Sequence, residues 1–262
     1  MTNGRPLARA VLLLFAMCAA STMLVQAFNA RSDATPQQWT LEAAPVTRIQ
    51  ITASNADVVL LPAPGDEIVV TLTGRRTGAQ PEVTVDGDVL RIRVVHRRQF
   101  GFFRRFLSLS VALPEREYAA LQAAVANGHL IAGQLRVGDV RVRQGKGGVR
   151  LESIRADRID LATGSGDLEL TDVQGTLSAT TRNGTIRVTA GVLEHPMDLQ
   201  TFHGDIRLQA AQPTDATLDL STVNGLVTVF GTRRGRSWHQ VLGSGDPMVR
   251  LAVRNGNIAV TD

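Results

Sequence analysis

Three aspartates are the residues whose type and spacing could support catalysis. Asp160, Asp198 and Asp219 occupy the same position in different copies of a short repeat. Stacked copies would place their carboxylates on one side of the molecule, where two carboxyl groups can act as general acid and base on a glycosidic bond. Two other copies carry Arg141 and Arg250 at that position. We expect these arginines to moderate the repulsion on a solvated face, and a carbohydrate-active enzyme is the alternative.

Other patterns that would indicate catalysis, a metal or a cofactor are not found in the sequence. The five histidines lack the H-E-x-x-H spacing of a zinc site, and His203 stands where other copies carry a turn asparagine. No serine lies in G-x-S-x-G, and "QGKGGV" lacks the spacing of a phosphate-binding loop. We therefore expect a protein that is not an enzyme and that needs no cofactor or metal.

Basic and aromatic residues are concentrated in residues 97–109, "RRQFGFFRRFLSL". The candidate contact residues are Phe100, Phe102, Phe103, Arg104, Arg105 and Phe106. Aromatic rings beside arginines suit an anionic membrane surface or an acidic groove on a partner. The alternative is a loop whose phenylalanines fold back and cover an open end of the fold.

A glycine recurs at nearly constant spacing along the second half of the chain. Its copies are Gly128, Gly147, Gly166, Gly184, Gly204, Gly225 and Gly256. The intervals are 19, 19, 18, 20, 21 and 31 residues, and a period near 19 is typical of a stacked architecture. We interpret these glycines as structural turns, one for each coil of the stack.

Apolar residues stand at fixed offsets from each glycine, seven and five before it and two and four after it. The positions between them are mostly polar, and this alternation predicts two half-buried strands per repeat. Asparagine precedes the glycine in four of the seven copies. Both residues tolerate positive φ, and stacked asparagines can form a hydrogen-bonded ladder. The regular period favours a β-solenoid over a meander of hairpins, which Asn-Gly in isolation would predict.

The region before the repeats contains a degenerate copy and several further strands. In "RIQITASNADVVL", residues 48–60, Ala56 stands at the glycine position. Strands are also predicted for residues 67–74, for the hairpin around Asp86-Gly87, and for residues 107–114. We expect these strands to form sheets that start or cap the coil.

The N-terminus has the composition of a targeting segment. Residues 1–27 contain two arginines followed by an apolar run, residues 10–25, which is short for a membrane span. We predict a signal peptide or an uncleaved anchor there, then a linker (28–38), an N-terminal β region (39–120) and the repeat β-solenoid (121–262). The fold class predicted is all-β, a solenoid of the single-stranded β-helix type with an N-terminal β-sheet region and an N-terminal hydrophobic targeting helix.

The charge balance does not indicate nucleic-acid binding. The formal net charge is +4, and it falls to +2 once the two arginines of residues 1–27 are removed. The only cysteine, Cys18, lies in the same segment, so we expect no disulfide in the exported part. We expect the protein in the periplasm or at the cell surface, either released or anchored in the inner membrane by residues 10–25.

Several motifs resemble those of a known family. They are "SNADVVL", "DGDVLRIRV", "VALPE" and the repeated "NG/SG/HG-x-I-x-V" units. Over about residues 39–262 the chain resembles the DUF4097 family of bacterial adhesin-like domains, a domain of unknown function. The resemblance implies a β-helical, non-enzymatic domain of the cell envelope, without catalytic residues to carry over. The interval of 31 residues is a departure, and its "GTRRGRSWHQVLGSGDP" could form a side loop or serve a local function.

The function expected from these observations is that of an exported, adhesin-like interaction scaffold at the bacterial cell envelope. Its outward side chains would face an envelope protein or a glycan, with the membrane surface as a further contact and no nucleic acid. The alternatives are an accessory protein of envelope-stress signalling held near the membrane, and the β-helix carbohydrate-active enzyme considered above.

Overall fold

The computed structural model describes residues 36–74, 79–96 and 107–262, which form nineteen β-strands in one continuous sheet and no helix. The strands before the repeats are β1 (Gln37–Glu42), β2 (Arg48–Ala63), β3 (Glu67–Thr73), β4 (Ala79–Asp86), β5 (Val89–His96) and β6 (Leu107–Pro114). The strands of the repeats are β7 (Glu117–Asn127), β8 (Leu130–Lys146), β9 (Val149–Ser165), β10 (Leu168–Asn183), β11 (Ile186–Thr189), β12 (Met197–His203), β13 (Ile206–Gln209), β14 (Ala216–Asn224), β15 (Val227–Val229), β18 (Met248–Asn255) and β19 (Ile258–Thr261). The inserted segment adds β16 (Thr232–Gly235) and β17 (Ser237–Leu242).

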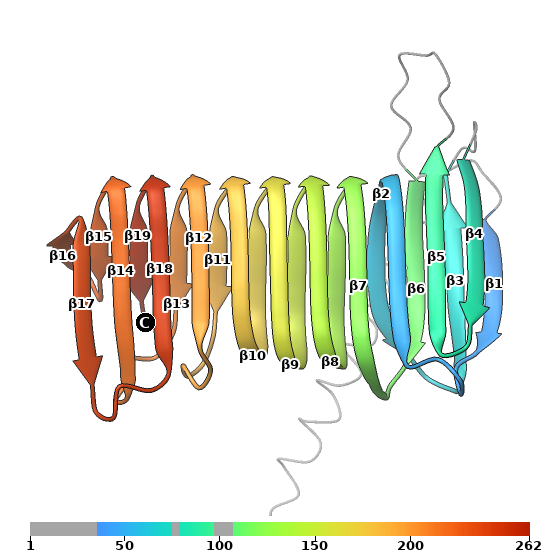
Figure 1. Cartoon of the computed structure of the whole chain (residues 1–262), viewed down its shortest axis with the longest axis horizontal. Coiled ribbons are helices and arrows are strands. Elements are labelled where there is room, and N and C mark those ends of the chain that lie inside the picture. The colour runs from blue at the N-terminus through green and yellow to red at the C-terminus, as the bar shows by residue number, and fades with distance from the viewer. Residues whose placement is uncertain (1–35, 75–78, 97–106) are drawn as a thin grey trace, which may run out of the picture.

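The repeats form the coils of a flattened stack with a front and a back layer (Figure 1). Each of β8, β9 and β10 begins in the back layer, bends at the lower edge and rises through the front layer to the corner glycine. Equivalent residues of neighbouring coils pair in parallel, as Leu130, Val149 and Leu168 do. Because neighbours in a hairpin meander would be antiparallel, this pairing confirms the solenoid-like stack.

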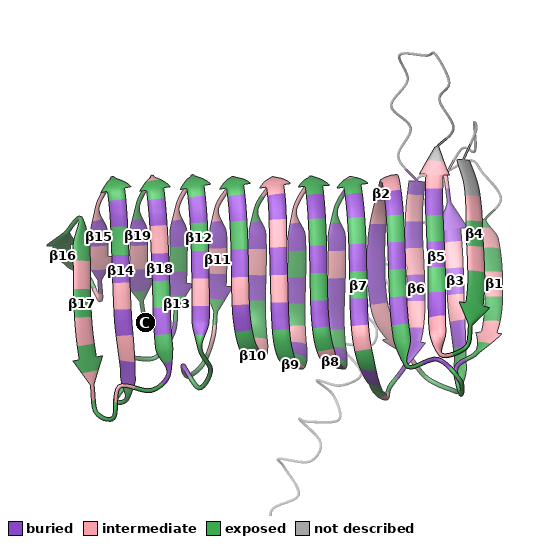
Figure 2. Cartoon of the chain, viewed as in Figure 1, coloured by how far each residue is buried: buried purple, intermediate pink, exposed green. Residues whose placement is uncertain are grey.

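Aliphatic side chains fill the space between the two layers. Val140 and Ile159 point inward from the front layer, and Val149 and Leu168 from the back layer, all almost fully buried. Figure 2 shows the alternation of buried and more exposed residues along each strand that the period-two pattern predicts. Burial stabilises each such side chain by about 1.5–3 kcal/mol relative to exposure. The stack is therefore held by many small side chains, which suits the low aromatic content of 4%.

The lower bend of each long strand is a second corner that the repeat analysis did not predict. Gln134, Ser153 and Asp172 occupy it with φ of 55°, 53° and 50°. Each lies six residues after a corner glycine. Polar residues that are not β-branched can adopt this positive φ. No glycine is therefore needed at this corner, and none marks the position in the sequence.

The order of the coils in space differs from their order in the sequence. The last coil, β18 and β19, lies between the coil of β12 and β13 and the coil of β14 and β15. The sequential stacking implied by the repeat is therefore wrong at this end. The 31-residue interval explains the difference, because it gives the chain enough length to turn back and insert one coil inward.

The N-terminal coil is placed in the same way at the other end. The first half of β2 pairs with β5 and β7, and its second half pairs with β6 and β8. Ala56 therefore lies beside the first corner glycine, as the degenerate repeat predicts. The predicted strands before the repeats and the hairpin at Asp86-Gly87 are confirmed.

Antiparallel strands close both ends of the stack. β4 pairs with β5, and β1 with β3, at the N-terminal end. At the C-terminal end β17 pairs with β14, and β16 with β15. The inserted segment thus forms edge strands and not a side loop, and such strands cover coils that would otherwise expose unpaired backbone groups.

Two predictions lie outside the described residues. One is the targeting segment with its helix, residues 1–27. The other is the cluster of phenylalanines and arginines within residues 97–106.

Candidate functional site

The predicted corner glycines form one file along the upper edge of the stack. In space their order is Gly128, Gly147, Gly166, Gly184, Gly204, Gly256 and Gly225. Gly147 shows why the position requires glycine: its φ is +122°, and an added Cβ would lie 1.7 Å from the carbonyl oxygen of Gly128. At Gly225, where φ is not positive, an added Cβ would still lie 1.9 Å from the carbonyl oxygen of Gly256. The close approach of neighbouring coils is thus sufficient to select glycine.

The residues before the corner glycines link neighbouring coils, as the predicted asparagine ladder requires. None of these residues has positive φ, so that part of the Asn-Gly interpretation is wrong for the asparagines. The hydrogen-bonded ladder itself is confirmed. Asn127 Nδ2 donates to Asn55 Oδ1 at 2.9 Å, and Asn224 Nδ2 donates to Asn255 Oδ1 at 2.8 Å. Asn255 Nδ2 lies 3.2 Å from His203 Nδ1, which confirms His203 as a turn residue.

A buried threonine stands three residues before several of the corner glycines. The hydroxyls of Thr181, Thr201 and Thr222 donate to the carbonyl oxygens of Gly166, Gly184 and Gly256 at 3.2, 3.1 and 2.8 Å. These bonds satisfy polar groups inside the corner, where an unpaired carbonyl would be costly. Within the described part of the chain, the Thr163 hydroxyl is buried without a partner.

A second ladder of side chains lies just after the corner glycines. Asp167 Oδ1 accepts the backbone N–H of Thr185 at 2.8 Å, and Asp205 Oδ1 accepts that of Asn257 at 2.9 Å. The bond from the Thr185 N–H, followed by the one from the Arg187 guanidinium, lowers the pKa of the Asp167 carboxyl despite an opposing effect of burial. The sequence carries a signal for this ladder that was missed, namely Asp or Asn directly after the glycine.

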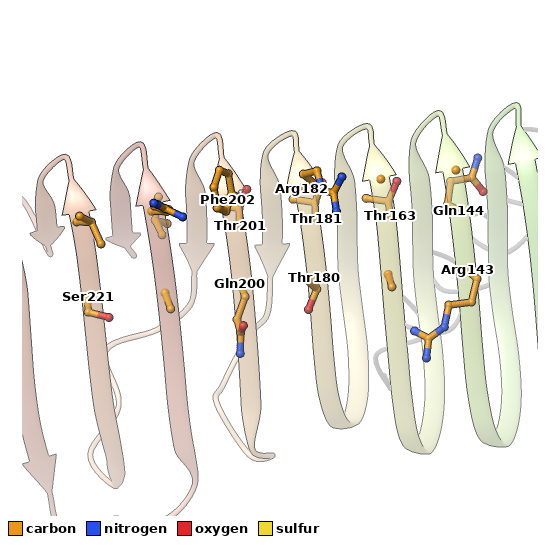
Figure 3. Close-up of a pocket in the computed structure, with 17 residues that line it drawn as sticks. Arg143, Gln144, Thr163, Thr180, Thr181, Arg182, Gln200, Thr201, Phe202 and Ser221 are labelled. Atoms are coloured by element: carbon orange, nitrogen blue, oxygen red, sulfur yellow. The ribbon is translucent and has the colours of Figure 1, made fainter.

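A groove of about 1140 Å³ crosses the outer face of the front layer below the corner file (Figure 3). It crosses β8, β9, β10, β12, β18 and β14. Its outward-facing lining residues are Arg143, Gly145, Ala162, Gly164, Thr180, Arg182, Gln200, Phe202, Ser221, Val223, Ala252 and Arg254. They stand two and four residues before the corner glycines. The glycines and alanines among them form the bottom of the groove, and the longer side chains form its sides.

Exposed apolar and cationic side chains meet in this groove. Phe202 and Val223 are 40% and 59% exposed. The Arg254 guanidinium carbon lies 4.6 Å from the centre of the Phe202 ring, a cation–π distance. The same ring meets His203 edge to face, with 4.6 Å between the ring centres. The groove therefore presents an aromatic surface with positive charge beside it.

The arginines of the groove differ in their partners. Arg143 is bound to Asp160, with its two terminal nitrogens 3.2 and 3.3 Å from the carboxylate oxygens. Among the described residues, Arg182 and Arg254 form no ion pair with a carboxylate. Both are exposed. Their charges are consequently available to a ligand.

The three candidate aspartates lie on the same face as the groove, nearer the lower edge. Arg141 Nε and Arg250 Nε approach Asp160 and Asp219 at 3.8 and 3.4 Å. Asp198 accepts hydrogen bonds from Gln200 Nε2 at 3.1 and 3.2 Å.

The coil order separates these carboxylates further. Asp198 pairs in register with Arg250, and Arg250 pairs with Asp219, so an arginine lies between the two acids. Ser178 lies between Asp160 and Asp198. The arginines in this column therefore reduce the repulsion between the aspartates, as the sequence predicted.

The back layer carries a denser network of ion pairs. Arg150 Nε donates to Glu169 Oε2 at 2.8 Å. Arg187 lies 3.1 Å from Asp167 and 3.7 Å from Glu169. These charges of the back layer therefore neutralise one another.

Within residues 36–74, 79–96 and 107–262, no three side chains of His, Cys, Asp or Glu are grouped so that they could hold a metal ion. No helix in the same ranges has the length and hydropathy to cross a membrane.

Comparison with known proteins assigns the family. The family model for Toastrack DUF4097 matches residues 46–261, and the chain belongs to this family. No curated protein matches the sequence.

The solved structures with a similar fold include the following three, all from bacteria. A "putative adhesin" from Bacteroides fragilis is 12% identical, with 87% of this chain and 98% of that chain covered and a TM-score of 0.47. A "putative lipid binding protein" from Parabacteroides distasonis is 12% identical over 88% and 98%, with a TM-score of 0.40. A "putative cell adhesion protein" from Clostridium sporogenes is 9% identical over 87% and 99%, with a TM-score of 0.39.

The groove itself was not predicted from the sequence. The outward positions of the repeat were predicted to form solvated polar faces, whereas small residues at Gly145, Ala162, Gly164 and Ala252 leave the surface low. Small residues at outward positions of successive repeats were the signal that could have located it.

Proposed function

We propose that this protein is a non-enzymatic interaction scaffold of the bacterial cell envelope, and that the groove of the front layer is its contact surface. The observation that carries the proposal is the groove itself. It crosses neighbouring strands and presents exposed apolar groups beside arginines that have no carboxylate partner among the described residues. Aromatic and arginine side chains are the types that contribute most to binding surfaces.

The rigid backbone supports a binding role. The strands beneath the groove are joined to one another by parallel ladders, so its side chains are held in a fixed array. A preorganised surface loses little conformational freedom on binding, which favours affinity.

The candidate acids favour binding over catalysis. Asp160 and Asp219 form ion pairs with arginines, and an arginine or a serine separates the acids of this column, so the column lacks the two adjacent, unpaired carboxyl groups that glycosidic cleavage uses. We therefore keep the proposal non-enzymatic.

Export is part of the proposal and is supported by the sequence. Residues 1–27 have the charged start and apolar run of a targeting segment. The scaffold would act in the periplasm or at the cell surface, released or held by residues 10–25. Fractionation of cells with and without a signal-peptidase inhibitor distinguishes these two states.

Binding to isolated cell envelopes tests the scaffold proposal. The full-length chain should sediment with envelopes, and the double substitution Phe202→Ser with Val223→Ser should reduce the bound fraction because it removes exposed apolar surface from the groove. Val192→Ser with Val241→Ser is the matched control, since these valines are 64% and 57% exposed outside the groove. Equal binding by both double variants would contradict the groove as the contact surface.

Turnover of polysaccharides is the test of the enzyme alternative. If the parent chain cleaves a polysaccharide and the triple alanine variant of Asp160, Asp198 and Asp219 does not, the non-enzymatic proposal is wrong.

A further inference from the structure

We propose that the groove binds an acidic glycan, a linear polysaccharide bearing carboxylate or sulfate groups, with its chain running across the strands. This inference rests on the proposed function and names the chemical class of the partner. It is carried by the charge, the length and the side-chain chemistry of the groove.

Charge complementarity points to an anion. Arg182, Phe202 and Arg254 occupy equivalent positions on β10, β12 and β18, which are neighbouring strands. Neighbouring strands lie about 4.8 Å apart, so the two arginine backbones are about 10 Å apart with the aromatic ring between them. Among the described residues, no aspartate or glutamate lines the groove. Each guanidinium can donate two parallel hydrogen bonds to one carboxylate or sulfate group.

The length of the groove points to a polymer. It extends from Arg143 on β8 to Val223 on β14, across five steps between strands. At about 4.8 Å for each step the length is about 24 Å. A single small anion would occupy only the segment between the two arginines, whereas an extended chain would use the remainder.

The other side chains favour a sugar polymer over an acidic peptide. Figure 3 shows Thr180 below Arg182 and Gln200 below Phe202 on the neighbouring strands β10 and β12, and Ser221 on β14, which lies beyond β18. Their hydroxyl and amide groups can both donate to and accept from sugar hydroxyls. A peptide strand binds a sheet through backbone hydrogen bonds at an edge, but the groove lies on a face whose backbone groups are already paired in ladders.

Affinity measurements on the full-length chain test the inference with three probes. Polygalacturonate is the linear acidic glycan, dextran is the neutral glycan, and polyglutamate is the acidic peptide. We expect binding to polygalacturonate that weakens as salt is added, and much weaker binding to dextran and to polyglutamate. Arg182→Gln with Arg254→Gln should weaken binding to polygalacturonate by at least about tenfold, which corresponds to about 1.4 kcal/mol.

The matched control is Arg233→Gln with Arg236→Gln. It removes the same two charges from exposed positions in the inserted segment, outside the groove. We expect its affinity to change by no more than about twofold, about 0.4 kcal/mol. Unchanged melting temperatures should accompany both double variants, because none of the four arginine side chains forms an ion pair within the described residues.

The outcomes separate this inference from the proposed function. Equal losses in both double arginine variants would show a general charge effect and overturn it, and so would equal affinity for polyglutamate and polygalacturonate. If no probe binds while envelope binding still depends on Phe202 and Val223, the acidic-glycan inference is wrong and the scaffold proposal stands.

Discussion

Gly256 stacks directly on Gly204, although 52 residues separate them in the sequence. The N–H of Gly204 donates to the carbonyl oxygen of Asn255 at 3.0 Å, and a Cβ added to Gly256 would lie 2.1 Å from the carbonyl oxygen of Gly204. The coil of Gly225, which precedes Gly256 in the sequence, is thereby displaced to the end of the stack. The C-terminal coil is an interior layer of the fold and not a terminal addition.

Removal of the C-terminal coil should therefore affect strands that precede it in the sequence. Without residues 248–262, β14 and β15 lose the coil that joins them to β12 and β13. Their remaining ladder partners are the edge strands β17 and β16. We expect limited proteolysis of the truncated chain to cut within residues 212–247, which should be resistant in the parent.

Removal of Asp262 alone is the control for this truncation. It deletes the carbonyl oxygen that accepts a hydrogen bond from Gln209 Nε2, and it leaves β18 and β19 in place. If residues 212–247 still resist proteolysis after removal of residues 248–262, the coil of β18 and β19 does not hold this end of the stack.

The corner file should be intolerant of a single added methyl group. Gly147→Ala would place Cβ 1.7 Å from the backbone oxygen of Gly128 at a φ of +122°. Overpacking and an unfavourable φ each cost about 1–3 kcal/mol, so we expect the free energy of unfolding to fall by at least about 2 kcal/mol. Chemical denaturation measures this change.

Gly65→Ala is the matched control because it separates the two causes. Gly65 also has positive φ, +98°, but no atom of the described residues lies within 4 Å of an added Cβ. Gly65→Ala should therefore lower the free energy of unfolding only by the cost of the unfavourable φ. Equal destabilisation at the two positions would mean that contact between the corners contributes nothing.

Periodicity was sufficient to predict the repeated part of the fold. The apolar residues two and four positions after each glycine lie on the buried face, as Ile186 and Val188 do. Such positions are set by local alternation, which is visible in a single copy and reinforced by the others. The strand of residues 107–114 was predicted with the bounds that β6 has.

The order of the coils could not be predicted in the same way. Any coil presents similar columns to either neighbour, so Leu199 can pair with Leu251 as well as with Leu220. Sequence periodicity records the shape of a coil but not which coil lies beside it. The groove was missed for a related reason, since it arises from side chains of coils whose order was unknown.

The threonines beneath the corner should contribute through one hydrogen bond each. Thr222→Val keeps the shape of the side chain but removes the hydroxyl that donates to the Gly256 carbonyl oxygen at 2.8 Å. We expect the free energy of unfolding to fall by about 1 kcal/mol, measured by chemical denaturation.

Thr163→Val tests the same substitution without the hydrogen bond. The Thr163 hydroxyl is buried and has no partner among the described residues, so its removal should leave stability unchanged or slightly raised. A loss at Thr163 as large as that at Thr222 would refute the assigned role of the bond.

The Arg48–Asp88 pair at the N-terminal end should be visible in an acid titration. Hydrogen bonding from Arg48, with Nε 2.9 Å from Asp88 Oδ2, and then from the Thr47 hydroxyl, lowers the pKa of the Asp88 carboxyl from 3.8 to about 2. Because the pKa in the folded chain is the lower one, the stabilising effect is complete above pH 3.8 and is lost as the pH falls toward 2.

Titration of the carboxyl carbon by NMR should show Asp88 ionised at pH 3, and Arg48→Gln should return its pKa toward 3.8. Arg91→Gln, which removes the neighbouring partner of Asp86, should leave the Asp88 titration in place. A parent chain in which Asp88 titrates near 3.8 would show that this exposed pair does not persist in solution.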